Sequence, residues 1–142
     1  MEETVIRVPA LEFKEVEDGW IEAQVRLPST QTGYYEDSVG GPTIATLVDL
    51  SVVEVIRAQE GVDGPTYALS YHIRKRVPVN TEIIVRAKAT RRRHTVYHAK
   101  VEIRDLAGIL LAHGKGSLKV AKTSSEETEY IILRNPHKGD SC

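Results

Sequence analysis

The chain has 142 residues, a formal net charge of −1 and a hydrophobic share of 41%. This length suits one domain with a proper core, and the near-neutral charge gives no general attraction to nucleic acid or to an anionic membrane. A single cysteine, Cys142, excludes a disulfide framework and a cysteine metal site within this sequence.

The first ten residues show no clear periodicity and predict a short strand or an ordered arm. The acidic start, Met1–Thr4, has no apolar run behind it, so we expect no secretory signal. No stretch reaches the roughly 18 apolar residues that cross a membrane. We therefore expect a cytoplasmic protein with no membrane partner.

Two segments that alternate apolar and polar residues, 11–16 and 20–27, flank the turn signal Glu17-Asp18-Gly19. Alternation with a period of two is typical of half-buried strands, so these segments predict a β-hairpin. Residues 28–40 follow as a loop rich in Ser, Thr, Gly and Tyr.

Only one long segment has the pattern of a helix, residues 42–59. Pro42 suits the first helical position, and from Thr43 to Ile56 the segment is apolar on nearly every face, which is typical of a helix buried on all sides. Asp49 lies in its middle. A buried carboxylate is costly unless it is paired, hydrogen-bonded or protonated, so Asp49 either serves chemistry or marks a wet seam.

Four segments with strand patterns follow, at 66–76, 82–90, 96–104 and 109–120. The turns between them are short, and residues 91–94 are predicted to form one, so we expect an antiparallel meander. A polar extension over 121–142 includes a further predicted edge strand at 129–134.

One helix with an antiparallel sheet is an α+β layout, in a single domain over 1–142 with its core at about 11–120. A single curled sheet leaves one face of the helix open. We therefore expect a partner subunit to complete the burial.

Four segments stand in a characteristic order: Asp18–Pro28, then Gly41 with Ala45-Thr46-Leu47-Val48-Asp49, then Thr66–Val77, then Asp105–Gly116. Together they resemble the hotdog-fold acyl-CoA thioesterases of the PaaI-like, phenylacetate-type branch. In that branch the helix carries His-Gly-Gly followed by Ala-Thr-Leu-x-Asp, and a later strand ends in Leu-Arg-Pro-Val. The resemblance covers most of the chain.

The resemblance implies a helix wrapped by a curved antiparallel sheet, homodimers that join two sheets edge to edge, and often homotetramers. It also implies hydrolysis of acyl-CoA thioesters at the dimer interface with no metal and no cofactor, since coenzyme A enters as part of the substrate. Two departures stand out. Gly40-Gly41-Pro42 replaces His-Gly-Gly, so the motif histidine is absent, and Arg76 replaces the motif proline.

Two residues are the candidate catalytic groups. Asp49 is a general base on a water or a nucleophile on the thioester carbonyl, in an apolar surrounding that includes Val53. Gly41 offers its backbone N–H, at a helix N-terminus, to the thioester oxygen. The alternatives are an aspartate that caps a backbone group or bonds across a dimer seam, and a glycine that only allows a tight start of the helix.

The candidate substrate-binding residues fall in three groups. The basic group Arg91-Arg92-Arg93-His94, with Arg74 and Lys75, predicts contacts with the CoA phosphates, because arginine binds phosphate by paired hydrogen bonds. Its alternative is a solvated hairpin turn. Tyr34 and Tyr35 either line the acyl pocket or cover the helix end. Val53 and Thr66 complete the set.

Other ligands are less well supported by the sequence. The five histidines form no metal-ligand spacing, so we expect no metal site. Aromatic residues are rarely interleaved with the basic ones, which argues against nucleic acid.

We therefore expect an acyl-CoA thioesterase that is at least a homodimer. The alternative is a hotdog protein that binds an acyl thioester or another apolar ligand with little or no hydrolysis, which the missing histidine favours. A hydratase or dehydratase ranks last, because it normally relies on a histidine near the start of the helix.

Overall fold

The structure is a computed structural model, and it describes residues 8–120. One long helix and six strands make up the domain, with two short 3₁₀ helices near its start. In chain order the elements are β1 (Lys14–Glu15), η1 (Glu17–Gly19), β2 (Trp20–Arg26), η2 (Ser29–Gln31), α1 (Gly41–Glu60), β3 (Thr66–Ile73), β4 (Glu82–Arg93), β5 (Val96–Asp105) and β6 (Leu110–Lys119).

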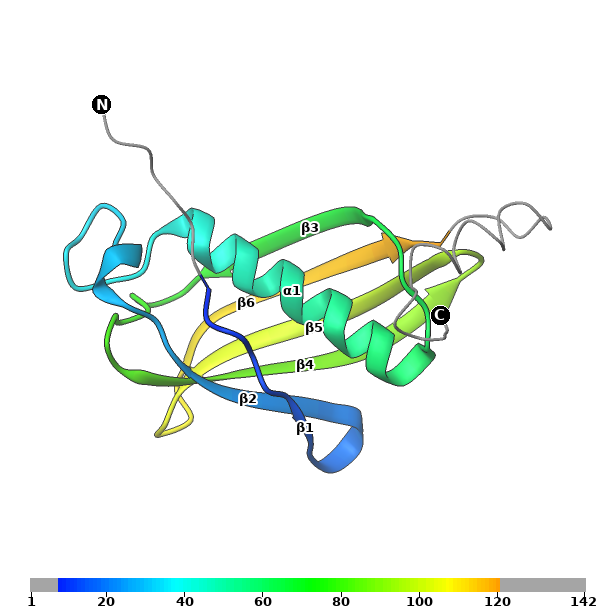
Figure 1. Ribbon diagram of the computed structural model, residues 1–142, viewed down its shortest axis with the longest axis horizontal. Helices are drawn as coiled ribbons and strands as arrows, with labels where there is room; N and C mark the ends of the chain where they lie inside the picture. Colours follow the sequence, from blue (N-terminus) through cyan, green and yellow to red (C-terminus); the bar gives the residue numbers. More distant parts are fainter. Residues whose placement is uncertain (1–7, 121–142) are drawn as a thin grey trace.

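The six strands form one curved sheet in the order β1-β2-β4-β5-β6-β3, and every neighbouring pair is antiparallel. Helix α1 lies across one face of this sheet, as Figure 1 shows. The predicted α+β layout is therefore confirmed. No helix within residues 8–120 is long and apolar enough to cross a membrane.

The predicted helix and hairpin are present. Helix α1 begins one residue before Pro42 and ends where Gly61 adopts a left-handed backbone (φ +68°) and donates its N–H to the Arg57 carbonyl. A Cβ is disfavoured at such a φ, so glycine suits this helix end. The hairpin forms between β1 and β2, although β1 is shorter than the predicted strand at 11–16.

Two predicted strand boundaries are wrong. Arg91, Arg92 and Arg93 do not form a turn; they continue β4 and pair with residues of β5, and the turn follows at His94, whose φ is +56°. A bulge after Ala89 shifts the register and lets the ladder run on. At the other end, β3 stops at Ile73 rather than at residue 76. The predicted strand at 129–134 lies outside the described residues.

The core fills the space between α1 and the sheet. The buried helical residues form a stripe at helical spacing that includes Ile44, Leu47, Val48, Val52, Val55 and Ile56. Two glycines of β6 lie beneath it. A Cβ at Gly114 would lie 2.8 Å from Val48 Cγ1, and one at Gly116 would lie 3.1 Å from Val52 Cγ2. The glycines therefore let the helix approach the sheet closely.

The helix is buried on one face only, as expected for a helix covered by a single curved sheet. Leu50 is 46% exposed, and Asp49 and Val53 are half-buried. A single sheet reaches only one side of a helix, so the apolar residues on the other side stay open. The edge strand β3 is also open, since Tyr67 is 62% and Ile73 45% exposed.

Candidate active site

Asp49 and Thr66 meet above the open part of the helix. The Thr66 hydroxyl donates a hydrogen bond of 2.6 Å to Asp49 Oδ1, joining the middle of α1 to the first residue of β3. The Asp49 carboxylate therefore has a fixed orientation while staying half-buried. Val53, one turn further along α1, is half-buried as well. The structure thus brings together three of the predicted site residues.

The start of α1 offers one unpaired backbone donor. Gly40 has an extended backbone, and its carbonyl accepts hydrogen bonds from the N–H groups of Thr43 and Ile44. Pro42 has no N–H. Within residues 8–120 the Gly41 N–H donates to no group, so it is free to bind an oxyanion at the positive end of the helix.

A tyrosine that the sequence analysis did not single out lies at the same place. A Cβ built on Gly41 would lie 3.4 Å from the Tyr71 hydroxyl oxygen, so this hydroxyl reaches the helix start from β3. The alternation of residues 66–76 put Tyr71 on one side of a strand with Tyr67, Leu69 and Ile73. Only the packing of β3 beside α1 reveals that it meets Gly41.

Gly41 and Asp49 are far apart within one chain. They are eight residues apart on α1, which at 1.5 Å per residue is about 12 Å along the axis. One thioester group cannot touch both. The two candidate catalytic groups therefore do not form one site on a single helix.

The two tyrosines of the loop before α1 are both exposed. Tyr34 is 94% exposed and packs edge-on against Tyr35 at 5.0 Å between ring centroids. The guanidinium of Arg76 lies 3.5 Å from the Tyr35 ring centroid and pairs with Asp37 at 3.6 Å. The residue that replaces the motif proline thus ties this loop to the end of β3.

The predicted basic group is split between the two ends of the sheet. Arg74 and Lys75 follow the last residue of β3, and both of their N–H groups donate to the Leu111 carbonyl. Arg93 lies at the end of β4, and the register of β4, β5, β6 and β3 places it near the Thr66 end, roughly 25 Å away from Arg74. The six basic residues therefore cannot hold one phosphate group together.

The basic residues at each end of the sheet also contact neighbouring groups. Arg92 Nε donates to the His94 carbonyl at 2.9 Å, and its guanidinium lies 5.3 Å from the Tyr97 ring. Arg74 Nε donates to His113 Nε2 at 3.0 Å, and the His113 ring stacks on His72. Burial and then the Arg74 charge lower the pKa of His113, which suits a neutral ring that accepts this bond. Residues 8–120 contain no group of three potential metal ligands.

Several solved structures have a fold similar to that of this chain. No protein-family model and no curated protein matches the sequence. A hypothetical thioesterase from Streptococcus pneumoniae, solved with coenzyme A, has a TM-score of 0.70 at 19% identity, with 82% of this chain and 93% of that chain covered. Zebrafish thioesterase superfamily member 2 has a TM-score of 0.69 at 19% identity, with 78% and 81% covered.

A Bacillus halodurans protein solved with CoA has a TM-score of 0.66 at 22% identity, covering 80% of this chain and 76% of its own. Another thioesterase superfamily structure is longer, and the match covers 56% of that chain. The pneumococcal protein has also been solved with an aspartate and with a threonine changed to alanine. These similarities show that the chain has the hotdog fold of thioesterase superfamily structures.

Proposed function

We propose that this protein is an acyl-CoA thioesterase. The contact that carries the proposal is the 2.6 Å hydrogen bond from Thr66 to the half-open Asp49 carboxylate in the middle of α1. The shared fold and the CoA in two of the similar structures support the substrate class. The aspartate and threonine changed in the pneumococcal protein are the two residue types that meet here.

In the proposed reaction, Asp49 acts as the general base. It takes a proton from a water, whose oxygen then attacks the thioester carbonyl carbon. The Thr66 hydroxyl holds the carboxylate in place. The tetrahedral intermediate collapses by breaking its carbon–sulfur bond, and Asp49 returns the proton to the departing CoA thiolate. The products are a carboxylic acid and CoA. In the alternative reaction the Asp49 carboxylate attacks the carbonyl carbon and expels the CoA thiolate, which leaves a mixed anhydride that water then cleaves. If water attacks the aspartyl carbon of this anhydride, ¹⁸O from labelled water enters Asp49 in a single turnover.

The Gly41 N–H is the proposed oxyanion donor. It lies at the positive end of α1 and has no competing acceptor within residues 8–120. Gly41 also leaves room for the thioester, because a side chain at this position would occupy the space beside the Tyr71 hydroxyl. That hydroxyl is a second donor beside Gly41, one residue after the position of the motif histidine, and we assign it a share in holding the thioester oxygen.

The proposed site needs two chains. Because Gly41 and Asp49 are about 12 Å apart on one helix, each thioester would meet Gly41 of one copy and Asp49 of the other. The open edge of β3 suits such a pairing, since a second copy can add its own edge strand there. The exposed apolar residues Leu50, Tyr67 and Ile73 would then be covered. We propose a homodimer; the expected tetramer stays a prediction.

The phosphates of CoA have candidate basic partners at both ends of the sheet. Arg92, Arg93 and His94 lie at the Thr66 end, whereas Arg74 and Lys75 lie at the Tyr71 end. In a two-chain site the second copy brings its own Arg74 and Lys75, so both ends stay candidates for one ligand. Tyr34 and Tyr35 stay candidates for the acyl pocket.

The direct test replaces Asp49 and measures thiol release from a panel of acyl-CoA esters. We expect Asp49→Asn to lower kcat/KM by at least about 100-fold, since general-base catalysis contributes roughly 10²–10⁴-fold. The matched control is Glu54→Gln on the same helix, whose carboxylate pairs with Arg57 at 3.4 Å. The control should retain activity. Equal turnover by wild type and Asp49→Asn would refute the assigned role.

The second candidate function is a binding protein that holds an acyl thioester without efficient hydrolysis. The observation that favours it is Gly40-Gly41-Pro42 in place of His-Gly-Gly. Calorimetry with a non-hydrolysable CoA thioether, run beside the thiol-release assay, distinguishes the two. Tight binding of the thioether with no thiol release by the wild-type protein would decide for the binding protein.

A further inference from the structure

Three lysines lie side by side on the outer face of the sheet, which faces away from α1. The strand register places Lys88 directly opposite Lys100, and Lys100 directly opposite Lys115, across β4, β5 and β6. We call these residues the lysine row. Like charges directly opposite each other on a sheet are destabilising. No carboxylate within residues 8–120 forms an ion pair with any of the three.

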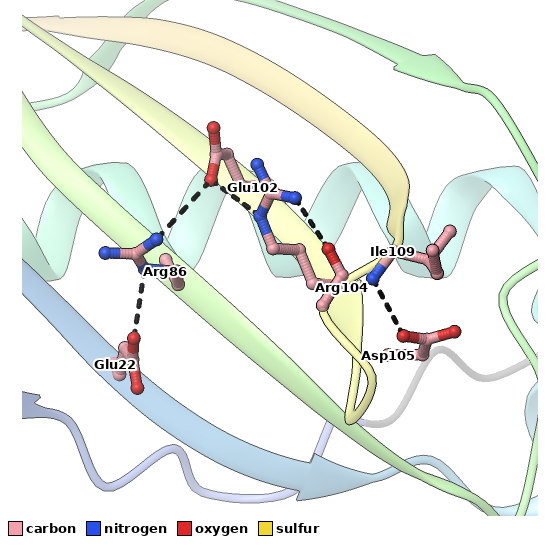
Figure 2. Close-up of polar contacts among 7 residues, drawn as sticks. Glu22, Arg86, Glu102, Arg104, Asp105 and Ile109 are labelled. Carbon is pink, nitrogen blue, oxygen red and sulfur yellow. Dashed lines mark hydrogen bonds and ion pairs between the residues drawn. The ribbon is translucent and has the colours of Figure 1, made fainter.

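The neighbouring row on the same face shows the opposite arrangement. There Glu22 faces Arg86, and Arg86 faces Glu102, so the charges alternate along the same strands. Figure 2 shows the resulting ion pairs, with Arg86 3.0 Å from Glu22 and Glu102 3.0 Å from Arg104. The fold therefore accommodates compensated charges on this face. The lysine row lacks that compensation.

Part of the lysine row borders a hollow of about 550 Å³ on the outer face. Its lining includes the cationic side chains of Arg91, Lys100 and Lys115, with His98 and the hydroxyl residues Ser70 and Ser117. No acidic residue and no residue of α1 lines it. A concave site with cations and hydroxyl groups but no carboxylate has the donor set that phosphate oxygens require.

The lowered pKa of His98 agrees with a positive potential in this hollow. Burial comes first among the causes that lower the pKa of His98, and the charges of Arg91 and Lys115 come next. Protonation of the imidazole is therefore disfavoured first by its burial and then by two of the cations that would receive an anion. Outside the hollow, the ammonium of Lys88 lies 5.9 Å from the Trp20 ring centroid, and that of Lys100 lies 5.1 Å from the same ring.

We propose that this hollow binds a small molecule through a phosphate group, held by Arg91, Lys100 and Lys115 with help from Ser70 and Ser117. The site lies on the face of the sheet opposite to α1 and Asp49, so it is separate from the proposed thioester site and does not depend on thioesterase activity. Two sources share this chemistry: the phosphates of a CoA molecule, and a different phosphorylated compound. A hollow of about 550 Å³ in a chain of charge −1 fits a small molecule better than a nucleic acid.

The test titrates full-length protein with inorganic phosphate, pyrophosphate and coenzyme A, followed by the amide NMR shifts of β5 and β6 and by calorimetry. The variant Lys100→Gln/Lys115→Gln should weaken pyrophosphate binding at least tenfold. The matched control, Lys14→Gln/Lys119→Gln, removes the same charge from exposed lysines outside the hollow, and its affinity for pyrophosphate should stay within twofold of wild type.

Removing the facing lysines should leave the melting temperature equal or higher. If the double variant does not fold, the single variant Lys115→Gln takes its place.

Each outcome has a defined meaning. A parallel loss of coenzyme A and pyrophosphate binding in the double variant supports the site with CoA as the source. Loss of pyrophosphate binding alone supports it with another phosphorylated ligand. The proposal is overturned if wild type shows no saturable binding of the three probes, if the control variant loses as much, or if only an oligonucleotide binds. Thiol release by the double variant, measured alongside, reports separately on the proposed thioesterase.

Discussion

At the scale of single residues, the central feature is one hydroxyl that fixes one carboxylate. Thr66 touches Asp49 from a different element, at the start of β3. A hydrogen bond to a charged group contributes about 1.5–3 kcal/mol. This energy is enough to keep the general base in a productive orientation, so Thr66 is a positioning residue in the proposed mechanism.

We therefore expect Thr66→Val to lower kcat roughly tenfold to 100-fold, because the lost hydrogen bond is one to a charged group. The KM for acyl-CoA should change little. Thr66→Ser keeps the hydroxyl and should restore most of kcat, whereas a residue that only fills space would be rescued by Val and not by Ser. Steady-state thiol release measures both constants, and equal effects of Val and Ser would contradict the assignment.

His98 offers a second prediction at this scale. Burial, Arg91 and Lys115 all lower its pKa, in that order of size. Replacing Lys115 by Gln removes a positive charge that opposes protonation, so the pKa of His98 should rise. NMR titration of the ring protons measures it. Lys14→Gln, at the other edge of the sheet, should leave the pKa unchanged, and a change of equal size there would point to net charge instead of local contact.

At the scale of elements, the close packing of α1 on β6 depends on the two glycines of that strand. A Cβ at Gly114 would lie 2.8 Å from both the Ser70 carbonyl oxygen and Val48 Cγ1. At Gly116 the nearest atoms are 3.0–3.1 Å away and include two side-chain atoms. The atoms around Gly114 therefore have less room to move aside for a methyl group than the atoms around Gly116.

Gly114→Ala should therefore lower the free energy of unfolding by about 1–3 kcal/mol, the usual cost of overpacking. Gly116→Ala should cost less, since flexible side chains can adjust there. Urea denaturation of the two variants measures which of them loses more free energy of unfolding. A larger loss at Gly116 would show that the helix-to-sheet distance is not limited at Gly114.

The elements were largely predictable from the sequence, and their contacts were not. Alternation and helical spacing depend on neighbours along the chain, so the hairpin, α1 and the four long strands follow from the pattern. The contact of Tyr71 with Gly41, the separation of Arg74 from Arg93, and the facing lysines depend on strand register and order. Register is set by which residues pair across the sheet, which no local pattern of this sequence encodes.

At the scale of the whole molecule, the separation of Gly41 and Asp49 predicts a shared site that mixing can reveal. Gly41→Val should obstruct one half of each site and Asp49→Asn should disable the other half. Each homodimer would then be inactive. A heterodimer would contain one intact site out of two, because two-fold symmetry pairs each residue with its counterpart on the other chain.

Denaturing and refolding the two variants together in equal amounts should therefore restore about one quarter of wild-type thiol release, since half of the dimers formed are mixed. The separately refolded variants, combined afterwards under conditions that block exchange, serve as the control. No recovery in the co-refolded sample, with heterodimers present by native mass spectrometry, would contradict a site shared between two chains.

Because these two residues are far apart on one rigid helix, the proposed reaction also depends on the association of two chains. Well below the dissociation constant of the dimer, the number of complete sites grows with the square of the chain concentration, because every site needs two chains. Above that dissociation constant, the number of complete sites grows in proportion to the chain concentration. Dilution would thus switch off turnover without altering a single residue, and the protein's abundance would act as its own regulator.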